Sequence, residues 1–153
     1  MKTNKVTNQT ELDGALKTMA ADDTVIIDGK MDCKNYYGRK IEAARFVDGE
    51  KKDMDRFLIE FTDGVTIALT DNGQSCCESR YMKCDDNLKD LVGGKLESIE
   101  IVKVDDVTPS YFQEKHQVAF IKISTDKDSI TINTHVEHNG YYGGFILNIA
   151  EVR

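Results

Sequence analysis

Two adjacent thiols followed by a carboxylate form the sharpest chemical motif in this sequence: Cys76, Cys77 and Glu78. Such side chains can bind zinc, and Cys84 with a histidine would complete a ligand set. Structural zinc sites, however, usually take cysteines at paired spacings such as Cys-x-x-Cys. Adjacent residues of an extended chain also point in opposite directions, so Cys76 and Cys77 do not easily face one ion. We therefore expect Cys76, Cys77 and Glu78 to be a structural motif, with no metal and no cofactor.

A nucleophilic thiol is the other chemistry open to this motif. Such a thiol needs a base within hydrogen-bond reach and a lowered pKa. The three histidines, His116, His135 and His138, lie far from the motif along the chain, which neither supports nor excludes catalysis. The run Val92-Gly93-Gly94-Lys95 lacks the remaining spacing of a phosphate-binding loop. We expect a protein that is not an enzyme.

Tyrosine pairs beside glycine are the best candidates for a binding surface. One pair is Tyr36 and Tyr37, followed by a glycine and Arg39, and the other is Tyr141 and Tyr142 between glycines. Aromatic rings stack on bases, and Tyr and Arg are enriched where binding energy concentrates. In the structural alternative, one ring of each pair packs inward and the next faces outward. The expected binding residues are Tyr36, Tyr37, Arg39, Arg80, Tyr81, Tyr141 and Tyr142, with Lys83 as a further cation for a phosphate.

The net charge of −7, from 27 acidic against 20 basic residues, argues against general binding of nucleic acid. Acidic side chains instead suit docking on a basic protein surface, including one that normally holds nucleic acid. The plain alternative is that the charge keeps a small protein soluble. We expect a host protein as partner, no direct nucleic-acid binding, and an oligomeric state that the sequence leaves open.

No stretch of the sequence approaches the ~20 apolar residues that span a bilayer. The first residues also lack the apolar core of a secretory signal. We therefore expect a cytoplasmic protein with no membrane partner, in which the four cysteines stay reduced.

Two segments carry helical signals. Residues 8–20 place apolar side chains on one face after a capping Asn8 or Thr10. Residues 85–92 precede Gly93 and Gly94, and glycine commonly ends a helix. The sequence predicts one N-terminal helix and a short helix after the cysteine motif.

The rest of the chain is strand-like. Residues 55–61 and 65–69 alternate apolar and polar side chains, and Asp63-Gly64 between them is the strongest short hairpin signal. In residues 96–104 neither alternating set is purely apolar, which predicts burial on both sides. The other expected strands are 23–28, 40–47, 117–124, 128–136 and 144–152.

These elements predict an α+β domain, in which a strongly curved, mainly antiparallel sheet of seven or eight short strands accompanies the two helices. A length of 153 residues fits one domain with its own core. No linker or low-complexity tract interrupts the chain. We expect residues 1–153 to form a single domain.

The segment from Phe57 to Ile149 resembles a family of small, uncharacterised phage and prophage proteins with a Cys-Cys-Glu motif. The residues that carry the resemblance are Asp71, Ser75-Cys76-Cys77-Glu78-Ser79, Asn87-Leu88-Lys89-Asp90-Leu91-Val92-Gly93, Ile130-Thr131-Ile132 and Asn139-Gly140-Tyr141-Tyr142. The resemblance implies a phage or integrated-element origin and a compact mixed domain, but no reaction. It makes residues 55–152 the family core, and residues 1–52 an N-terminal part particular to this protein.

Small size, negative charge and the lack of a catalytic signature favour a non-enzymatic accessory protein of a phage or mobile element that binds a host component. One concrete version is a host-defence antagonist, such as an anti-CRISPR protein that acts through its acidic surface. The alternative is a binding protein or sponge for a signalling nucleotide, which would use the tyrosines with Arg39, Arg80 or Lys83. The second alternative is a metal-dependent or thiol enzyme.

Overall fold

The computed structural model describes residues 27–28, 30–47, 55–73, 79–107, 115–138 and 143–152. Within these ranges the chain forms nine strands and two short 3-10 turns. The strands are β1 (Ile27–Asp28), β2 (Ile41–Val47), β3 (Arg56–Phe61), β4 (Thr66–Asp71), β5 (Ser79–Cys84), β6 (Leu96–Asp106), β7 (Lys115–Thr125), β8 (Ser129–His138) and β9 (Phe145–Glu151). The 3-10 turns are η1 (Lys34–Tyr36) and η2 (Leu88–Leu91).

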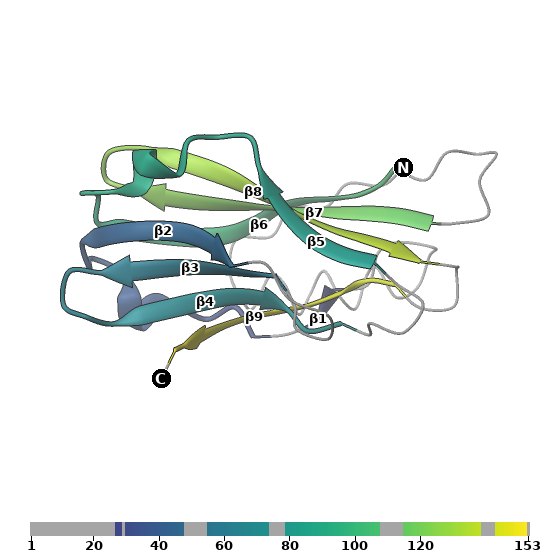
Figure 1. Cartoon of the computed structure of the whole chain (residues 1–153), viewed down its shortest axis with the longest axis horizontal. Coiled ribbons are helices and arrows are strands. Elements are labelled where there is room, and N and C mark those ends of the chain that lie inside the picture. Colours follow the sequence, from purple (N-terminus) through teal and green to yellow (C-terminus); the bar gives the residue numbers. More distant parts are fainter. Residues whose placement is uncertain are drawn as a thin grey trace.

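The strands form two sheets that lie one above the other (Figure 1). The five-stranded sheet has the order β1-β9-β4-β3-β2, and the four-stranded sheet has the order β5-β8-β7-β6. All neighbouring strands are antiparallel except β1 and β9, which are parallel. The predicted antiparallel pairing is therefore confirmed, but it builds two sheets instead of one curved sheet.

The expected α+β class is wrong for the part of the chain that the structure describes, which is mainly antiparallel β with no α-helix. The short helix expected at residues 85–92 is only the 3-10 turn η2, for which the Asn87 side chain accepts a hydrogen bond from the Lys89 N–H. The turn stops because Gly93 donates its N–H to the Ile41 carbonyl over 2.8 Å, which pulls the chain toward β2. The helix expected at residues 8–20 lies outside the described residues.

One apolar core fills the space between the sheets. Alternation places Phe57, Ile59 and Phe61 of β3 on the same face, and all three are buried in this core. On β8, Ile130, Ile132 and Val136 are the opposing inward side chains. Period-two patterning therefore predicted the inward face of β3 correctly, and β8 has the same alternation.

The hairpin predicted at Asp63-Gly64 is confirmed. Strands β3 and β4 pair antiparallel up to Glu60 and Thr66, and the Phe61 N–H then donates to the Val65 carbonyl over 2.8 Å. Gly64 has a φ of 88°, a conformation that glycine adopts without steric cost.

Strand β6 explains why neither phase of residues 96–104 looked apolar. Leu96, Ile99, Ile101 and Val104 all face the core. The inward positions therefore switch from even to odd numbers after Leu96 and back to even numbers at Val104. The pairing with β7 shifts register between Leu96 and Ser98 and again between Ile101 and Lys103. Each shift inserts a residue and moves the inward face to the other phase.

Backbone hydrogen bonds join the two sheets along one side. Ile41 donates its N–H to the Gly94 carbonyl over 2.9 Å, and Gly38 donates to the Leu96 carbonyl over 2.7 Å. Lys40 and Lys95 form an isolated antiparallel bridge between these contacts. The edges of β2 and β6 are therefore held together where both strands begin.

No helix within the described ranges is both long enough and apolar enough to cross a membrane.

We predict that Ile121→Ala, at the fully buried centre of β7, lowers the free energy of unfolding by about 2–5 kcal/mol, because it leaves a cavity between the sheets. The neighbouring Lys122→Ala change, on the exposed side of the same strand, should stay within about 0.5 kcal/mol of the parent. Urea unfolding of both variants measures the difference. Equal losses from the two changes would show that the Ile121 side chain does not point between the sheets.

Candidate functional site

Strand β5 places two of the predicted binding residues on opposite sides of the four-stranded sheet. Arg80 lies opposite Val136 of β8, whose side chain is in the core, and Tyr81 lies opposite His135 on the outer face. Because side chains alternate along a strand, Arg80 points between the sheets and Tyr81 points away from them. The two residues therefore belong to different environments and do not form one binding surface.

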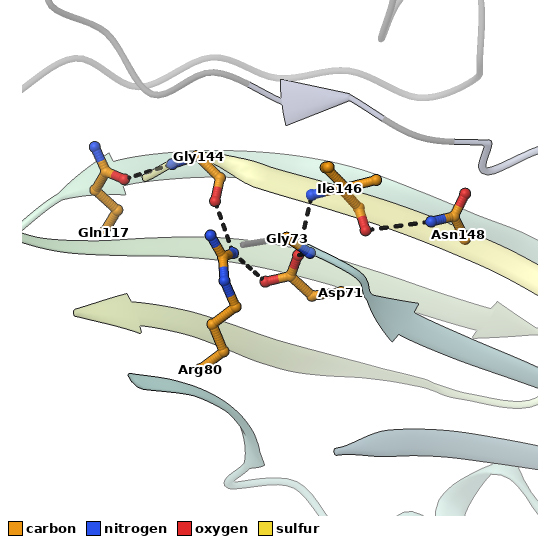
Figure 2. A network of polar contacts seen from close by, with 7 residues as sticks. All are labelled: Asp71, Gly73, Arg80, Gln117, Gly144, Ile146 and Asn148. Carbon is orange, nitrogen blue, oxygen red and sulfur yellow. Dashed lines mark hydrogen bonds and ion pairs between the residues drawn. The ribbon is translucent and has the colours of Figure 1, made fainter. Parts of the chain in front are cut away.

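Arg80 forms a buried ion pair with Asp71, the last residue of β4 (Figure 2). Its Nη1 lies 2.7 Å from Asp71 Oδ2, and the two side chains are only 7% and 3% exposed. The same Nη1 donates to the Gly144 carbonyl over 2.9 Å. The other carboxylate oxygen of Asp71 accepts the N–H groups of Gly73 and Ile146 over 3.1 and 3.0 Å. Pairing and hydrogen bonding together satisfy a charge that burial would otherwise disfavour.

Gln117 of β7 extends this network across the inward face of the four-stranded sheet, because it lies opposite Val136 on one side as Arg80 does on the other. Its Oε1 accepts the Gly144 N–H over 2.9 Å, so Gly144 is held by both its N–H and its carbonyl (Figure 2). The network therefore joins β4, β5, β7 and the start of β9. In the sequence, Gly73 and Arg80 of this network lie on either side of residues 74–78, and Gly144 lies shortly after residues 139–142.

The predicted motif residues Cys76, Cys77 and Glu78 and the predicted binding residues Tyr141 and Tyr142 lie outside the described residues. Their predicted roles stay predictions.

Gly73 allows the guanidinium of Arg80 to lie against the backbone. A Cβ atom on Gly73 would overlap the guanidinium carbon of Arg80 and lie only 2.5 Å from its Nη2. Any other residue at this position would have to displace a side chain that is fixed by an ion pair. The glycine is thus part of the network, although its sequence context gave no sign of it.

A cavity of about 10 Å³ lies beside the ion pair, lined by Asp55, Asp71, Arg80, Tyr81, Met82 and Thr134. The hydroxyl of Thr134 is buried there without a hydrogen-bond partner among the described residues. This space is of the order that a single water molecule needs. A nucleotide does not fit this cavity, and the ion pair with Asp71 leaves the Arg80 side chain only 7% exposed.

On the outer face, the Tyr81 ring stacks on His135, and His116 contacts His135 with its ring tilted by 36°. The Tyr81 and His135 rings lie 4.7 Å apart with an angle of 9° between their planes. His135 Nδ1 lies 2.9 Å from His116 Nε2, so one imidazole donates to the other. Lys83 Nζ lies over the Tyr81 ring at 5.3 Å from its centroid. Sequence reasoning selected Tyr81 and Lys83, but it linked neither to a histidine.

The pKa of His135 is lowered from 6.5 to about 4, mainly by burial and then by the nearby His116 and Lys83, which disfavour a further positive charge. Glu137 and Asp85 act in the opposite direction and do not offset these effects. Burial together with Glu137 raises the pKa of Tyr81. His135 is therefore neutral at physiological pH, with its ring packed between Tyr81 and His116.

A second lysine and ring meet on the same outer face. Lys103 Nζ lies over the Phe120 ring at 5.4 Å from its centroid, and it also pairs with Asp105 Oδ2 at 2.8 Å. Sequence reasoning missed both residues. Both residues point outward, Phe120 from β7 and Lys103 from β6, and the pairing of the two strands places them opposite each other.

The predicted binding residues Tyr36 and Arg39 do come together, but as part of the scaffold. The Arg39 guanidinium carbon lies 5.0 Å from the centroid of the Tyr36 ring, which also stacks in parallel on Phe61. The Tyr36 hydroxyl donates to Glu151 over 3.2 Å, and Arg39 pairs with Asp63. The Tyr36 ring therefore contacts Arg39 and Phe61, and its hydroxyl contacts Glu151.

Tyr37 lies beside the buried Cys33, whose thiol donates to the Tyr37 hydroxyl over 3.7 Å. Burial raises the pKa of the Cys33 thiol, and burial with this contact raises the pKa of Tyr37 to about 12. The thiol is therefore protonated and unsuited to nucleophilic attack. Tyr37 is 37% exposed, so its ring still borders solvent.

The structure does not bring the Tyr36 group and the Arg80 group together. Tyr36 contacts Glu151, which pairs with Ile67 at the start of β4, whereas Arg80 contacts Asp71 at its end. Four residues of extended chain separate these points by roughly 13 Å. The tyrosines and cations therefore divide into separate sites.

Within the described ranges, no group of three or more histidine, cysteine, aspartate or glutamate side chains has an arrangement that could hold a metal ion.

Residues 34–147 match the family described as Domain of unknown function (DUF7448). The chain belongs to this family. The matched residues of DUF7448 run from the first residue of η1 into β9, and they include both the Asp71–Arg80 pair and the outer ring stack. The family description gives no activity, and it establishes neither a phage origin nor a Cys-Cys-Glu motif. Searches of curated proteins and of solved structures found no match to this chain.

We predict that Arg80→Met lowers the free energy of unfolding by about 3–5 kcal/mol, because it leaves the Asp71 carboxylate buried without its counter-charge. Arg39→Met is the matched control, since it removes the same side chain from an exposed ion pair that is worth about 0–1 kcal/mol. Urea unfolding at neutral pH measures both. If Arg80→Met is no more costly than Arg39→Met, the buried pair does not hold the sheets together.

We predict that the imidazole of His135 titrates with a midpoint near pH 4 in the folded protein. In the unfolded chain the pKa of His135 is near 6.5. Between pH 4 and pH 6.5, His135 is therefore mostly protonated in the unfolded chain and mostly neutral in the folded chain. The stability that His135 contributes is therefore complete above about pH 6.5, falls as the pH falls toward 4, and is constant below that. Histidine NMR during an acid titration checks the midpoint. A His135 midpoint at pH 6 or above would contradict the buried ring stack.

Proposed function

We propose that this protein is a non-enzymatic binding protein that docks on a basic surface of a host protein. The observation that supports this proposal is a concentration of fixed carboxylates at one end of the four-stranded sheet. We call this surface the acidic end and define it as residues 85–97 and 125–129. Its exposed acidic side chains are Asp85, Asp86, Asp90, Glu97, Asp126 and Asp128, and its lysines are Lys89, Lys95 and Lys127.

The two segments of the acidic end are held against each other by their own carboxylates. Asp86 accepts the Thr131 N–H over 2.8 Å, and Asp126 accepts the Lys95 N–H over 2.8 Å. Asp128 accepts the Ser129 N–H over the same distance. Carboxylates fixed in this way lose little conformational freedom on binding, so they favour rapid and specific association with a positive surface.

An exposed apolar residue lies among these charges. Val92 is 46% exposed, and it follows η2 between Asp90 and Lys95. Protein interfaces combine an apolar centre with a polar rim, and here the acidic residues supply the rim. The arrangement supports contact with a protein that offers both lysine or arginine side chains and an apolar patch.

The proposed biological setting rests on the resemblance to phage and prophage proteins. A phage or mobile-element protein with an acidic docking surface would act in the host cytoplasm, without binding nucleic acid directly. An antagonist of host defence, for example an anti-CRISPR protein, would use the acidic end to occupy a basic groove that normally holds nucleic acid. Membership of DUF7448 is compatible with this proposal and does not test it.

We predict that Asp90→Lys weakens the capture of a host protein at least tenfold or abolishes it. The change places a positive charge beside Val92, where the proposal requires a negative one. Glu42→Lys, on the exposed side of β2, is the matched control with the same change in net charge. Each variant would be used as bait in host lysate, and the captured protein would then be purified and its association rate measured at increasing salt. The rate should fall with salt for the parent, since charges steer the encounter.

The proposal fails if no protein is captured reproducibly by the parent. It also fails if Asp90→Lys and Glu42→Lys capture the partner equally well, because the acidic end would then not be the contact surface.

A further inference from the structure

We propose that the outer face of the four-stranded sheet binds a dinucleotide, with one base on Tyr81, one base on Phe120 and the phosphates on Lys83 and Lys103. This site lies on the face of the sheet and borders the acidic end at Asp85, and the inference goes beyond the proposed function. The inference rests on two similar units, each a lysine placed over an aromatic ring, which we call the ring–lysine pairs. They are Tyr81 with Lys83 and Phe120 with Lys103, at 5.3 and 5.4 Å from nitrogen to ring centroid.

The strand register places Lys83, Phe120 and Lys103 in one row across the sheet, and Tyr81 lies two residues before Lys83 on the same face of β5. Lys83 lies opposite Asn133, Asn133 lies opposite Phe120, and Phe120 lies opposite Lys103. Strands are about 4.8 Å apart, so the backbones of the two lysines are separated by roughly 14 Å, with an aromatic ring and an amide between them. This spacing suits a ligand with two bases and a short phosphate linkage, and the Asn133 amide can donate to and accept from a base edge.

The Tyr81 ring is held in place before a ligand arrives. His135 stacks on Tyr81 and is itself hydrogen-bonded to His116, so the Tyr81 ring is supported by two further side chains. Bases stack on such rings with little sequence preference, because every base has an aromatic face. A rigid platform of this kind binds with a smaller loss of conformational freedom than a mobile one.

The lysines are positioned to move from ring to phosphate. A contact between an exposed ammonium group and a ring is weak, whereas a charge-assisted hydrogen bond to a phosphate is considerably stronger. Lys83 is exposed, and Lys103 is 44% exposed at its side chain. Lys83 can therefore leave its ring to a base and hold the adjacent phosphate, and Lys103 has three N–H donors, so it can contact a phosphate while it keeps its ion pair with Asp105.

Charge decides between a dinucleotide and a longer nucleic acid. The row carries two lysines, but Glu137 and Asp85 lie next to it on β8 and after β5, and the whole chain has a net charge of −7. Two phosphates are matched by two lysines, whereas each further phosphate of a polymer would meet acidic side chains. The inference therefore specifies a small nucleotide and not a nucleic-acid strand.

Calorimetric titration of the purified full chain with linear and cyclic dinucleotides of purine and pyrimidine bases tests the proposal. The parent should bind at least one of them with a single ligand per chain. Lys83→Gln should weaken that binding about 10-fold to 100-fold, the usual range for one hydrogen bond to a charged group. Lys122→Gln is the matched control, because Lys122 is an exposed lysine on the outward phase of β7 outside the row, and it should change the affinity less than twofold.

Three results would overturn the proposal: no binding of any dinucleotide by the parent, equal effects of Lys83→Gln and Lys122→Gln, or tighter binding of a 20-nucleotide strand than of the dinucleotide. Phe120→Leu separates ring from charge, since it keeps both lysines and removes the second stacking surface. It should also weaken binding, and pyrophosphate alone should bind much more weakly than the dinucleotide. Because the titration contains no host protein, its outcome is independent of the proposed docking function.

Discussion

The ion pair between Asp71 and Arg80 is the interaction on which the two-sheet arrangement depends. It connects the end of β4 in one sheet with the start of β5 in the other, and the Gly144 carbonyl and the Gln117 amide extend it to β9 and β7. Taking both charges out of water has a large cost, which their attraction offsets only when the remaining hydrogen-bonding groups are satisfied. Here Asp71 accepts two backbone N–H groups in addition to the guanidinium. The network therefore fixes the position at which the chain crosses from one sheet to the other. With apolar packing alone, the two sheets could slide relative to each other.

The opposite side of the sandwich is closed by backbone instead of charge. The contacts of residues 38–41 with residues 93–96 bring β2 against β6, and Gly94 lies so close to Thr125 that a Cβ atom there would overlap the threonine hydroxyl. With both sides held, the sheets cannot rotate relative to each other without breaking one connection. The outward positions of β5, β7 and β8 are thus fixed in register, which explains how rings from three strands can meet at short distances. The geometry of the outer face therefore depends on contacts that are buried inside.

Sequence patterns predicted the parts of this fold that short-range alternation controls. The Asp63-Gly64 hairpin, the antiparallel pairing and the inward face of β3 follow from period-two spacing and turn chemistry. Strand β5 escaped notice because Arg80 occupies an inward position where a strand pattern calls for an apolar residue, and its partner Asp71 lies in another strand and another sheet. The expected α+β class failed because residues 85–92, despite their helical composition, form only a four-residue 3-10 turn before Gly93 donates a hydrogen bond to Ile41 of β2. Tyr81 and Lys83 were identified from residue type, whereas His116, His135, Phe120 and Lys103 became neighbours only through the pairing of distant strands.

Strand β5 also connects the two surfaces for which we propose functions. Its inward side chain Arg80 anchors the sheets, its outward side chains Tyr81 and Lys83 form one ring–lysine pair, and Asp85 and Asp86 of the acidic end follow it directly. The sign of the exposed charge thus changes within two residues, from Lys83 to Asp85. A basic protein surface is attracted to the end of the strand and a phosphorylated ligand to its face, so one overall negative charge is compatible with both. Because both surfaces are set by the register of β5, a displacement of this strand at Arg80 would alter the geometry of the two together.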